Sequence, residues 1–331
     1  MTKTSDAHLG MHILEVEITN QCNLNCKHCY NRDQNPANLP AQKIEQLYQF
    51  ANKHSVWRFV ISGGEALIHP DFDRIARYIE KNRGSTSAVL QTNGSLIHEA
   101  MIDRIRMFDV IHISYDLARD VRTSGYENYE KAILLKRNGL NSYLFSTIHK
   151  KNRHLIAEMV DKAHQADIPI GFNICLPTTN LDDSYIMSQT EIMETERILL
   201  NYYNNGKILR YTSPLTAVWE PSKKQEKFTK ILGGCTAGIA ACVVDPSGDV
   251  LPCPFLRLSG GNINKQKLEN IWEHSPLFAQ IRDRGSYDQP CGSCQFLAFC
   301  GGCRMRAYVS TGSLTGSDPM CYIHKTQQEN I

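Results

Sequence analysis

The stretch ITNQCNLNCKHCYNRD, residues 18–33, brings three cysteines within eight residues: Cys22, Cys26 and Cys29. An aromatic residue, Tyr30, directly follows the last of them. Cysteine thiolates are the usual ligands of iron–sulfur clusters, and a four-iron cluster takes four ligands. The spacing C-x3-C-x2-C therefore supplies three of these ligands and leaves one iron open to a ligand from outside the protein.

Zinc is the alternative occupant of such a group of thiolates. A structural zinc site needs a fourth protein ligand, and His28 could in principle provide it. However, His28 is adjacent to Cys29, which is too close in sequence to complete the same small tetrahedron comfortably. The loop therefore favours an iron–sulfur cluster over zinc.

The composition of the chain is that of a globular protein of the cytoplasm. Its 331 residues can form one large domain and a smaller one, because single cores stop growing near about 250–300 residues. The first residues show no signal pattern, and no apolar run is long enough to span a membrane. A formal net charge of only +2 argues against nucleic acid as an obligatory partner. Twelve cysteines in such a chain indicate metal sites more than disulfides.

The remaining cysteines form a second field near the C-terminus, apart from Cys175, which stands alone. Two separate groups of cysteines suggest two kinds of metal site and two domains. We predict an N-terminal tail at 1–11, a first domain at 12–178, a bridging linker at 179–232 and a cysteine-rich domain at 233–331. The second field comprises Cys235, Cys242, Cys253, Cys291, Cys294, Cys300, Cys303 and Cys321.

Six apolar, β-branched runs alternate with stretches of helical period along the first domain. This alternation predicts an α/β fold with a parallel sheet and right-handed crossovers. In such sheets the chemistry gathers at the C-terminal ends of the strands. The expected strands are 12–19, 57–63, 87–94, 109–116, 142–149 and 168–177.

The unusual residues of the first domain fall at these strand ends. The cysteine loop follows the first strand, GGE (63–65) follows the second, and TNG (92–94) follows the third. Ser114 and Asp116 end the fourth strand, and Cys175 ends the sixth. Ordinary loops would not place their unusual residues so consistently, so we expect the functional site at this edge.

The C-x3-C-x2-C loop, followed by an aromatic residue and placed just after a first strand, resembles the signature of radical S-adenosylmethionine (radical SAM) enzymes. The resemblance implies a partial (β/α)6 barrel of the TIM type. It also implies that the open iron chelates the amino and carboxylate groups of SAM. Electron transfer from the cluster then cleaves SAM to methionine and a 5′-deoxyadenosyl radical, chemistry that is carried by the cofactor.

The same resemblance implies which residues contact SAM. Gly63, Gly64 and Glu65 match the GGE motif that contacts the SAM amino group, where glycines allow a close approach of the backbone and Glu65 can accept from the ammonium. Further contacts to the carboxylate or ribose are expected from residues at the same edge. These are Tyr30, Asn93, Ser114 and Asp116, although Ser114 has the alternative of being an ordinary strand-end hydroxyl.

The second cysteine field resembles the SPASM extension, which is found in radical SAM enzymes that modify peptides and proteins. The match lies in CTAGIAACVVDPSGDVLPCPF (235–255), CGSCQFLAFCGGC (291–303) and the later Cys321. One departure is that only Gly301 and Gly302 separate Cys300 from Cys303, where the family often has three residues.

By this resemblance the extension holds two auxiliary four-iron clusters, which makes three [4Fe–4S] clusters in the chain. Two four-cysteine zinc sites are the competing interpretation, because C-x2-C pairs also occur in zinc ribbons. The nearer auxiliary cluster is expected to use Cys235, Cys242, Cys253 and Cys303, and the farther one Cys291, Cys294, Cys300 and Cys321.

Cys175 allows two interpretations. A lone cysteine on an apolar strand is usually a small core residue. At the end of the sixth strand its thiol could instead face the radical and donate a hydrogen atom, as thiols do in radical epimerases. The alternation of side chains along a strand leaves the facing direction open.

The resemblance implies a function in which the radical abstracts a hydrogen atom from a ribosomally made peptide or a protein side chain. The auxiliary clusters would take up the electron that remains on the substrate. A tetrapyrrole or other small biosynthetic intermediate is the alternative substrate, because CGGCRMRAY, followed by TG and DPMC, also resembles haem-biosynthetic relatives. A non-catalytic cluster-binding protein is a third possibility, and the intact cysteine loop and GGE argue against it.

We also expect two protein partners. An external electron donor such as flavodoxin or ferredoxin would reduce the cluster. Only eleven residues precede the first strand, which is too few for an independent core. A leader-bearing peptide is therefore expected to need a separate leader-binding protein, or to be held by the linker and the SPASM surface.

Overall fold

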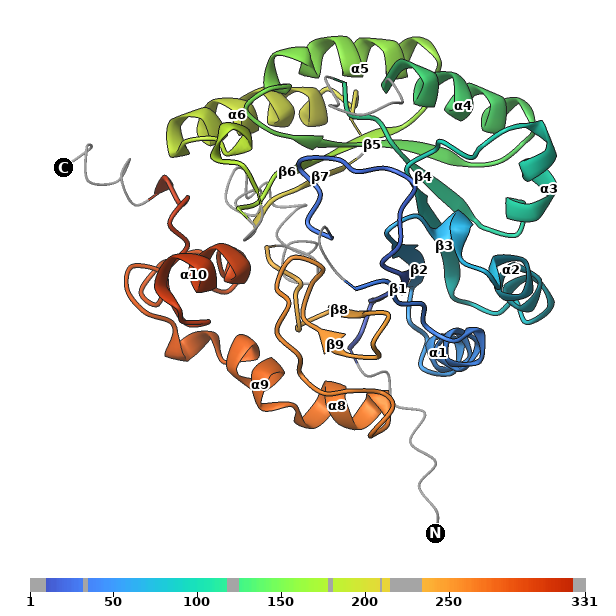
Figure 1. The fold of residues 1–331 in the computed structure, drawn as a ribbon. Helices are drawn as coiled ribbons and strands as arrows, with labels where there is room; N and C mark the ends of the chain where they lie inside the picture. Colours follow the sequence, from blue (N-terminus) through green and yellow to red (C-terminus); the bar gives the residue numbers. More distant parts are fainter. Residues whose placement is uncertain are drawn as a thin grey trace.

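The centre of the molecule is one curved sheet. The structure is a computed structural model that describes residues 10–31, 35–117, 125–177, 181–208, 210–214 and 234–323. Within these residues the sheet has nine strands in the order β7-β6-β5-β4-β3-β2-β1-β8-β9 (Figure 1). The strands are β1 (Ile13–Thr19), β2 (Arg58–Gly63), β3 (Ser87–Thr92), β4 (Val110–Ser114), β5 (Ser142–Ile148), β6 (Ile170–Ile174), β7 (Arg210–Thr212), β8 (Ala241–Val244) and β9 (Val250–Leu251).

Helices cover the outer side of this sheet, and a second group of helices follows β9 (Figure 1). The outer helices are α1 (Ala41–Lys53), α2 (Phe72–Lys81), α3 (Ile102–Ile105), α4 (Gly125–Arg137), α5 (Ile156–Gln165) and α6 (Gln189–Asn204). The later group is α8 (Leu268–His274), α9 (Pro276–Arg282) and α10 (Arg304–Thr311). Short 3-10 turns lie at η1 (Ala66–Ile68), η2 (Glu99–Met101), η3 (Arg153–Leu155), η4 (Asp183–Tyr185) and η6 (Arg284–Ser286).

The sheet is parallel over most of its width and stays open. Neighbouring strands from β1 to β7 all pair in parallel, and β8 also pairs with β1 in parallel. Only β9, at one edge, is antiparallel to its neighbour. Because β7 and β9 form the two edges of the described sheet, it curves without closing. This confirms the α/β class and the partial barrel that the sequence predicts.

The apolar core lies between the sheet and the outer helices. In α1, Ile44, Leu47, Tyr48 and Ala51 are buried, and their spacing of three and four residues puts them on one helical face. Alternate residues of the strands, such as Leu14 in β1, are buried in the same core. Burial of these apolar side chains therefore determines which face of the sheet is turned toward the helices, and the other face becomes the inner one.

The opposite, inner face of the sheet is partly polar. On β1 and β2 the hydroxyl of Ser62 donates to Glu15 Oε1 at 2.7 Å. On β4 and β5 the ring of His112 lies nearly parallel to the rings of Tyr143 and Phe145, with centroids 5.7 and 5.9 Å apart. Polar side chains at alternate strand positions thus mark the inner face as the side that can receive polar ligands.

Two strands depart from the sequence-based expectation. β7 and α6 fall inside 179–232, where the sequence predicts only a bridging linker, and β7 extends the sheet beside β6. β8 belongs to the predicted cysteine-rich domain, yet it pairs with the first strand of the barrel. The sheet therefore crosses the boundary that the two cysteine fields suggest.

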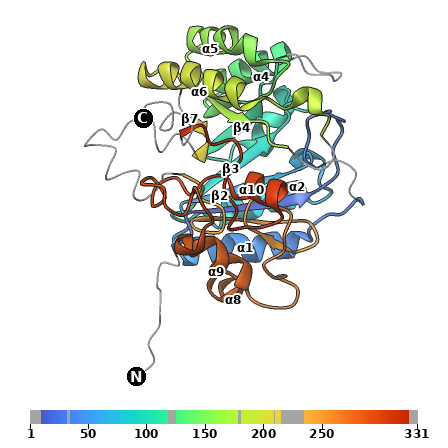
Figure 2. The same ribbon diagram turned by 90° about the vertical axis from the view of Figure 1, so that its left-hand side faces the viewer.

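The later helices share the core of the first domain. Trp272 and Phe278 belong to the same apolar cluster as the residues of α1, and Figures 1 and 2 both place α8 near α1. His54, at the end of α1, lies with its Nε2 3.4 Å from Glu269 Oε1 on α8. The cysteine-rich part is therefore packed onto the barrel through a continuous core.

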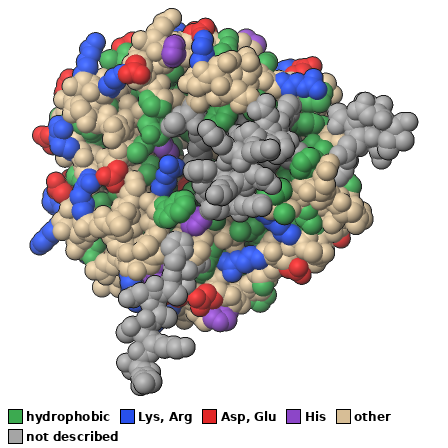
Figure 3. Space-filling model, turned by 180° about the vertical axis from the view of Figure 1, so that it is seen from behind, with side chains coloured by type: hydrophobic (Ala, Val, Ile, Leu, Met, Phe, Trp, Pro, Cys, Tyr) green, Lys and Arg blue, Asp and Glu red, His purple; other side chains and the backbone are tan. Residues whose placement is uncertain are grey.

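The surface agrees with the small net charge of the sequence. Acidic and basic side chains are interspersed over the face seen in Figure 3. Among the helices of the described residues, none is both long enough and apolar enough to cross a membrane.

Candidate cluster and cofactor site

The cysteine loop, residues 22–29, begins just beyond β1 and is shaped by hydrogen bonds to its own thiols. The amide of Leu24 donates to Cys22 Sγ at 3.4 Å, and the amide of Asn31 donates to Cys29 Sγ at 3.4 Å. A turn within the loop joins Cys29 N to Cys26 O at 3.1 Å. Hydrogen bonds to cysteine sulfur stabilise the thiolate and tune the potential of a bound cluster.

The glycine pair of the GGE motif lies against the start of this loop. The Gly64 amide donates to Thr19 O at 2.7 Å, and the Glu65 amide donates to Gln21 O at 2.8 Å. A Cβ on Gly63 would lie 2.1 Å from Thr19 O, and one on Gly64 would lie 2.1 Å from Gln21 O. The immediate reason for the two glycines is therefore backbone packing between β2 and the cysteine loop, which the sequence reasoning missed.

Glu65 is fully buried and joins three segments. Its Oε1 accepts from Leu67 N at 3.1 Å and from Thr92 Oγ1 at 2.8 Å, while its Oε2 accepts from Asn93 N at 2.7 Å. The carboxylate therefore fixes the end of β3 relative to the end of β2. A contact between Glu65 and the SAM amino group stays a prediction.

Asn93 connects the end of β3 to the cysteine loop. Its Nδ2 donates to Asn23 Oδ1 at 2.9 Å and lies 3.7 Å from Cys22 Sγ. A fully buried residue that the sequence reasoning missed, Asn128 on α4, donates to Asn93 O at 2.8 Å and to Ser114 O at 2.6 Å. The ends of β3 and β4 are thus held together beside Cys22.

Asp116 lies under the other side of the loop. Its Oδ1 accepts from Thr147 N at 2.7 Å and from Ser146 Oγ at 3.2 Å, and its Oδ2 lies 3.6 Å from His28 Nε2. The ring of His28 is 5.4 Å from the buried ring of His149. The sequence reasoning gave no role to His149, which has no spacing that marks it as part of a site.

Cys175 is buried at the end of β6, with its amide donating to Ile148 O at 2.8 Å. It is not among the residues of the apolar core clusters of the described chain. Burial, with a smaller contribution from the nearby Asp116 carboxylate, raises the pKa of the Cys175 thiol to about 12. The thiol therefore keeps its proton at neutral pH.

Tyr30 contacts both β1 and the second cysteine field. Its hydroxyl donates to Glu17 Oε1 at 3.0 Å, and its ring packs edge-on against Phe255, with centroids 4.9 Å apart. Phe255 belongs to the second cysteine field. A contact between Tyr30 and SAM stays a prediction.

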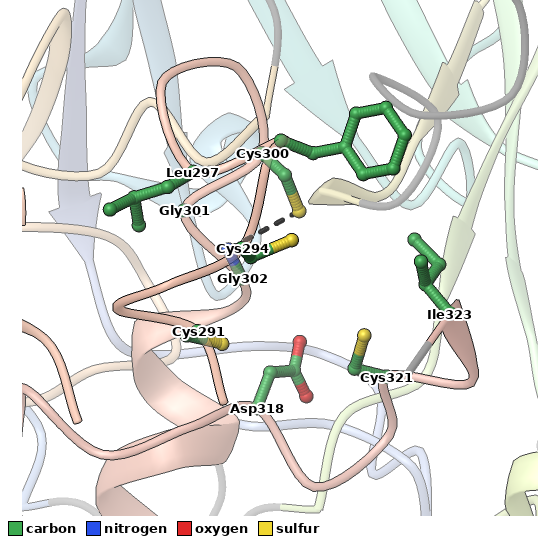
Figure 4. A pocket seen from close by; sticks show the side chains of 10 residues that line it. Cys291, Cys294, Leu297, Cys300, Gly301, Gly302, Asp318, Cys321 and Ile323 are labelled. Carbon is green, nitrogen blue, oxygen red and sulfur yellow. Dashed lines mark hydrogen bonds between the residues drawn. The ribbon is translucent and has the colours of Figure 1, made fainter. Parts of the chain in front are cut away.

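Four cysteines of the second field line one pocket of about 330 Å³, part of it open to solvent. Figure 4 shows their sulfur atoms around a common space, beside Asp318. Gly301 and Gly302 have φ values of +66° and +60°, a backbone conformation that favours glycine. This turn accommodates the two-residue spacing between Cys300 and Cys303. The cysteines are Cys291, Cys294, Cys300 and Cys321, and four thiols around one space fit a four-iron cluster.

Three further cysteines interact with one another outside this pocket. The pKa of Cys253 is raised by burial and then by the charges of Cys235 and Cys303. The pKa of Cys303 is raised chiefly by burial, and the charge of Cys235 adds to the effect. We call these three residues the nearer set.

Cys242 does not lie with the nearer set. It is 1% exposed on the core face of β8, opposite Leu14, and its Sγ is 3.9 Å from Met11 Sδ. Val244, two residues later on the same face, is in the same apolar core. Strand alternation thus turns Cys242 into the core; this position speaks against the ligand role that the sequence predicts for it, and that role stays a prediction.

Comparisons with known proteins agree with this arrangement. The Radical SAM superfamily model matches residues 16–185, and the SPASM model, an iron-sulfur cluster-binding domain, matches residues 235–295. The AdoMet-dependent heme synthase of Methanosarcina barkeri is 28% identical over 93% of this chain and 95% of its own. The mycofactocin maturase MftC of Mycobacterium ulcerans is 25% identical over 93% of this chain and 87% of its own.

Among solved structures, Streptococcus suis SuiB bound to S-adenosylmethionine superposes with a TM-score of 0.77 at 19% identity. The match covers 95% of this chain and 77% of SuiB, and SuiB is also solved with its precursor peptide SuiA. The extent of the superfamily match and the placement of the cysteines lead to one conclusion: the chain belongs to the Radical SAM superfamily, carries a SPASM domain, and is a radical SAM enzyme.

Proposed function

We propose that this enzyme modifies a ribosomally made peptide or a protein side chain. When bound, the clusters and SAM supply a 5′-deoxyadenosyl radical that removes a hydrogen atom from the substrate, and an acceptor for the electron that remains. Cys22, Cys26 and Cys29 hold the cluster that binds SAM. Glu65, Asn93, Ser114 and Asp116 surround the same edge of the sheet and orient the cofactor.

The second field holds two auxiliary clusters in this proposal, which gives three [4Fe–4S] clusters per chain. The far pocket provides four thiols, and the nearer set provides three. With Cys242 in the core, the fourth ligand of the nearer cluster comes from outside the eight cysteines of the second field. That position is open to water, another side chain or substrate.

The observation that carries the proposal is the contact between the two fields. β8, which precedes Cys253, pairs with β1, which leads into the cysteine loop, and Phe255 packs against Tyr30. Electron uptake by an auxiliary cluster requires it to lie near the substrate that the radical attacks. The shared sheet and the aromatic contact support such proximity, because they bring the segment that carries Cys253 beside the segment that carries the cysteine loop.

The relatives support two substrate classes. The name of the mycofactocin maturase and the SuiB complex with a precursor peptide favour a peptide. The AdoMet-dependent heme synthases, of which the Methanosarcina protein is 28% identical, favour a tetrapyrrole carboxylate as the second candidate. With either substrate class, the enzyme needs an external one-electron donor such as flavodoxin or ferredoxin. With a peptide substrate, it also needs a separate leader-binding protein.

The test supplies the reconstituted enzyme with SAM, a reductant and one deuterated candidate substrate at a time. A short precursor peptide encoded by a neighbouring gene is compared with a tetrapyrrole carboxylate. We expect deuterium to appear in 5′-deoxyadenosine only with the peptide, because only a hydrogen atom taken from the bound substrate is transferred. Deuterium transfer from the tetrapyrrole alone would establish the second candidate and contradict the first.

Two variants control this experiment. Cys22→Ala should transfer no deuterium from either substrate, because it removes a ligand of the SAM-binding cluster. Cys242→Ala should transfer deuterium as the wild type does, because its thiol lies in the core away from the other cysteines.

A further inference from the structure

Two of the neighbours of the cysteine loop belong to different parts of the chain. At its first cysteine it contacts β3, through the side chain of Asn93 near Cys22 Sγ. Just beyond its last cysteine, Tyr30 contacts Glu17 on β1 and Phe255 of the second cysteine field. One end of the loop is therefore held by the barrel, and the other is held partly by the auxiliary domain.

The hydroxyl of Tyr30 is fixed through a buried carboxylate. Glu17 is fully buried, and its two oxygens accept from Arg257 Nη1 at 2.8 and 3.1 Å in addition to the Tyr30 hydroxyl. Arg257 is itself oriented, because its Nη2 lies 3.5 Å from Asp245 Oδ2. Removing one partner of a buried ion pair strongly destabilises the fold. Arg257 therefore fixes the Glu17 carboxylate, and the carboxylate in turn fixes the hydroxyl of Tyr30.

Arg257 and Phe255 lie in the segment that also carries a cysteine of the nearer set. Phe255 is two residues from Cys253, and Arg257 is four residues from it. The amide of Leu256, between them, donates to Cys253 Sγ at 3.3 Å. A movement of Cys253 therefore displaces the two side chains that hold Tyr30, the residue next to Cys29.

From this chain of contacts we propose that Tyr30, Glu17, Phe255 and Arg257 are positioning residues that couple the nearer set to the cysteine loop. Occupation of the nearer set by a metal group fixes Cys253 and, through these four residues, the position of Cys29. The inference rests on the proposed function, because it takes both groups of cysteines as cluster ligands. It adds that the two sites do not act independently. The far pocket lies one step further along these contacts, because it touches the nearer set where Cys235 N donates to Cys300 O at 3.1 Å and Cys303 N donates to Asp318 Oδ2 at 2.8 Å.

The first test measures hydrogen exchange in the metal-free full chain, so it does not depend on any activity. Tyr30→Phe removes only the hydroxyl that binds Glu17. We expect the amides of Cys29 and Asn31 to exchange roughly tenfold faster, as for the loss of a hydrogen bond to a charged group. Tyr126→Phe is the matched control, because it removes a hydroxyl that donates to a carboxylate, Glu158 Oε1, at 2.6 Å on the distant α4 and α5.

The second test uses the loaded enzyme and reads the electron paramagnetic resonance signal of the reduced SAM-binding cluster. Cys253→Ala should alter the line shape and the midpoint potential of this signal, and Cys294→Ala, in the far pocket, should alter both much less, because it lies further from the cysteine loop along the chain of contacts. In a Tyr30→Phe background, Cys253→Ala should cause a smaller change than in the wild type. A double-mutant comparison of this kind isolates the coupling from the separate effect of each substitution.

Two results would overturn the inference. One is equal exchange in the cysteine loop for Tyr30→Phe and Tyr126→Phe. The other is a SAM-cluster signal in Cys253→Ala that matches that of Cys294→Ala. A chain that loads no iron at all would instead refute the proposed function, and the exchange experiment would still decide whether the contacts hold the loop.

Discussion

Replacing Gly64 by alanine tests whether the GGE motif first serves to pack two pieces of backbone together. The added Cβ would lie 2.1 Å from Gln21 O and 2.6 Å from Gln21 C, closer than real Cβ contacts. Because both neighbours are backbone, no side-chain rotation can relieve the overlap. The end of β2 must therefore move away from the start of the cysteine loop.

The size of the effect follows from the contacts that this movement breaks. The bonds from Gly64 N to Thr19 O and from Glu65 N to Gln21 O are 2.7 and 2.8 Å long, and each lost buried bond costs about 1–3 kcal/mol. Overpacking itself costs about 1–3 kcal/mol. We expect Gly64→Ala to lower the free energy of unfolding by about 3–9 kcal/mol, the sum of these ranges.

The assay combines urea unfolding of the full chain with iron analysis after anaerobic reconstitution. Gly285→Ala is the matched control, because a Cβ there meets only the Asp283 side chain, at 3.4 Å. We expect a lower urea midpoint for Gly64→Ala alone and a fall from about twelve to about eight irons per chain, since four irons fill each cluster. A Gly64→Ala variant with the midpoint and iron content of the wild type would refute the packing argument.

Four further outcomes test the roles of the cysteines. Iron analysis of the wild-type enzyme should give about twelve irons per chain. Cys242→Ala should keep all of them, and Cys253→Ala should lose about four. Iron loss in Cys242→Ala would show that Cys242 is a cluster ligand. Cys294→Ala should stop product formation while SAM is still cleaved to 5′-deoxyadenosine, whereas Cys22→Ala should abolish SAM cleavage. Loss of SAM cleavage in both variants, with both still folded, would contradict this division of roles between the two groups of cysteines. Because burial raises the pKa of Cys175 to about 12, its alkylation at pH 8 should be far slower in the folded than in the unfolded chain. Cys175→Ala should leave turnover nearly unchanged if the thiol only fills space, and a substrate radical that forms but is not quenched would make it the hydrogen donor.

The strands of the first domain could be predicted because their signal is local. All six apolar runs correspond to β1 to β6, with ends that differ by at most a few residues. β7 was missed because its three residues, RYT, contain no apolar run. The cysteine loop and the four cysteines of the far pocket could be recognised because their spacing is short and specific.

The misplaced or missed residues depend on contacts between distant segments. Cys242 has the right residue type for a ligand, and only the register of β8 against β1 turns it into the core. Tyr30 contacts Glu17 and Phe255, and the second of these contacts depends on the packing of two domains, which no local sequence pattern predicts. Asn128 is a polar residue on α4 that packs closely against the turn at Gly94, where an added Cβ would lie 2.8 Å from Asn128 Oδ1.

The pairing of β1 with β8 also has a consequence for the synthesis of the chain. Ile13 pairs with Ala241, so this edge of β1 has no partner until most of the chain has left the ribosome. At about 5–20 residues per second the wait is roughly 10–45 s, during which an apolar strand edge is available to other chains. A fragment that ends before β8 would keep this exposed edge permanently, so we expect it to aggregate even though it contains the whole cysteine loop and the GGE motif.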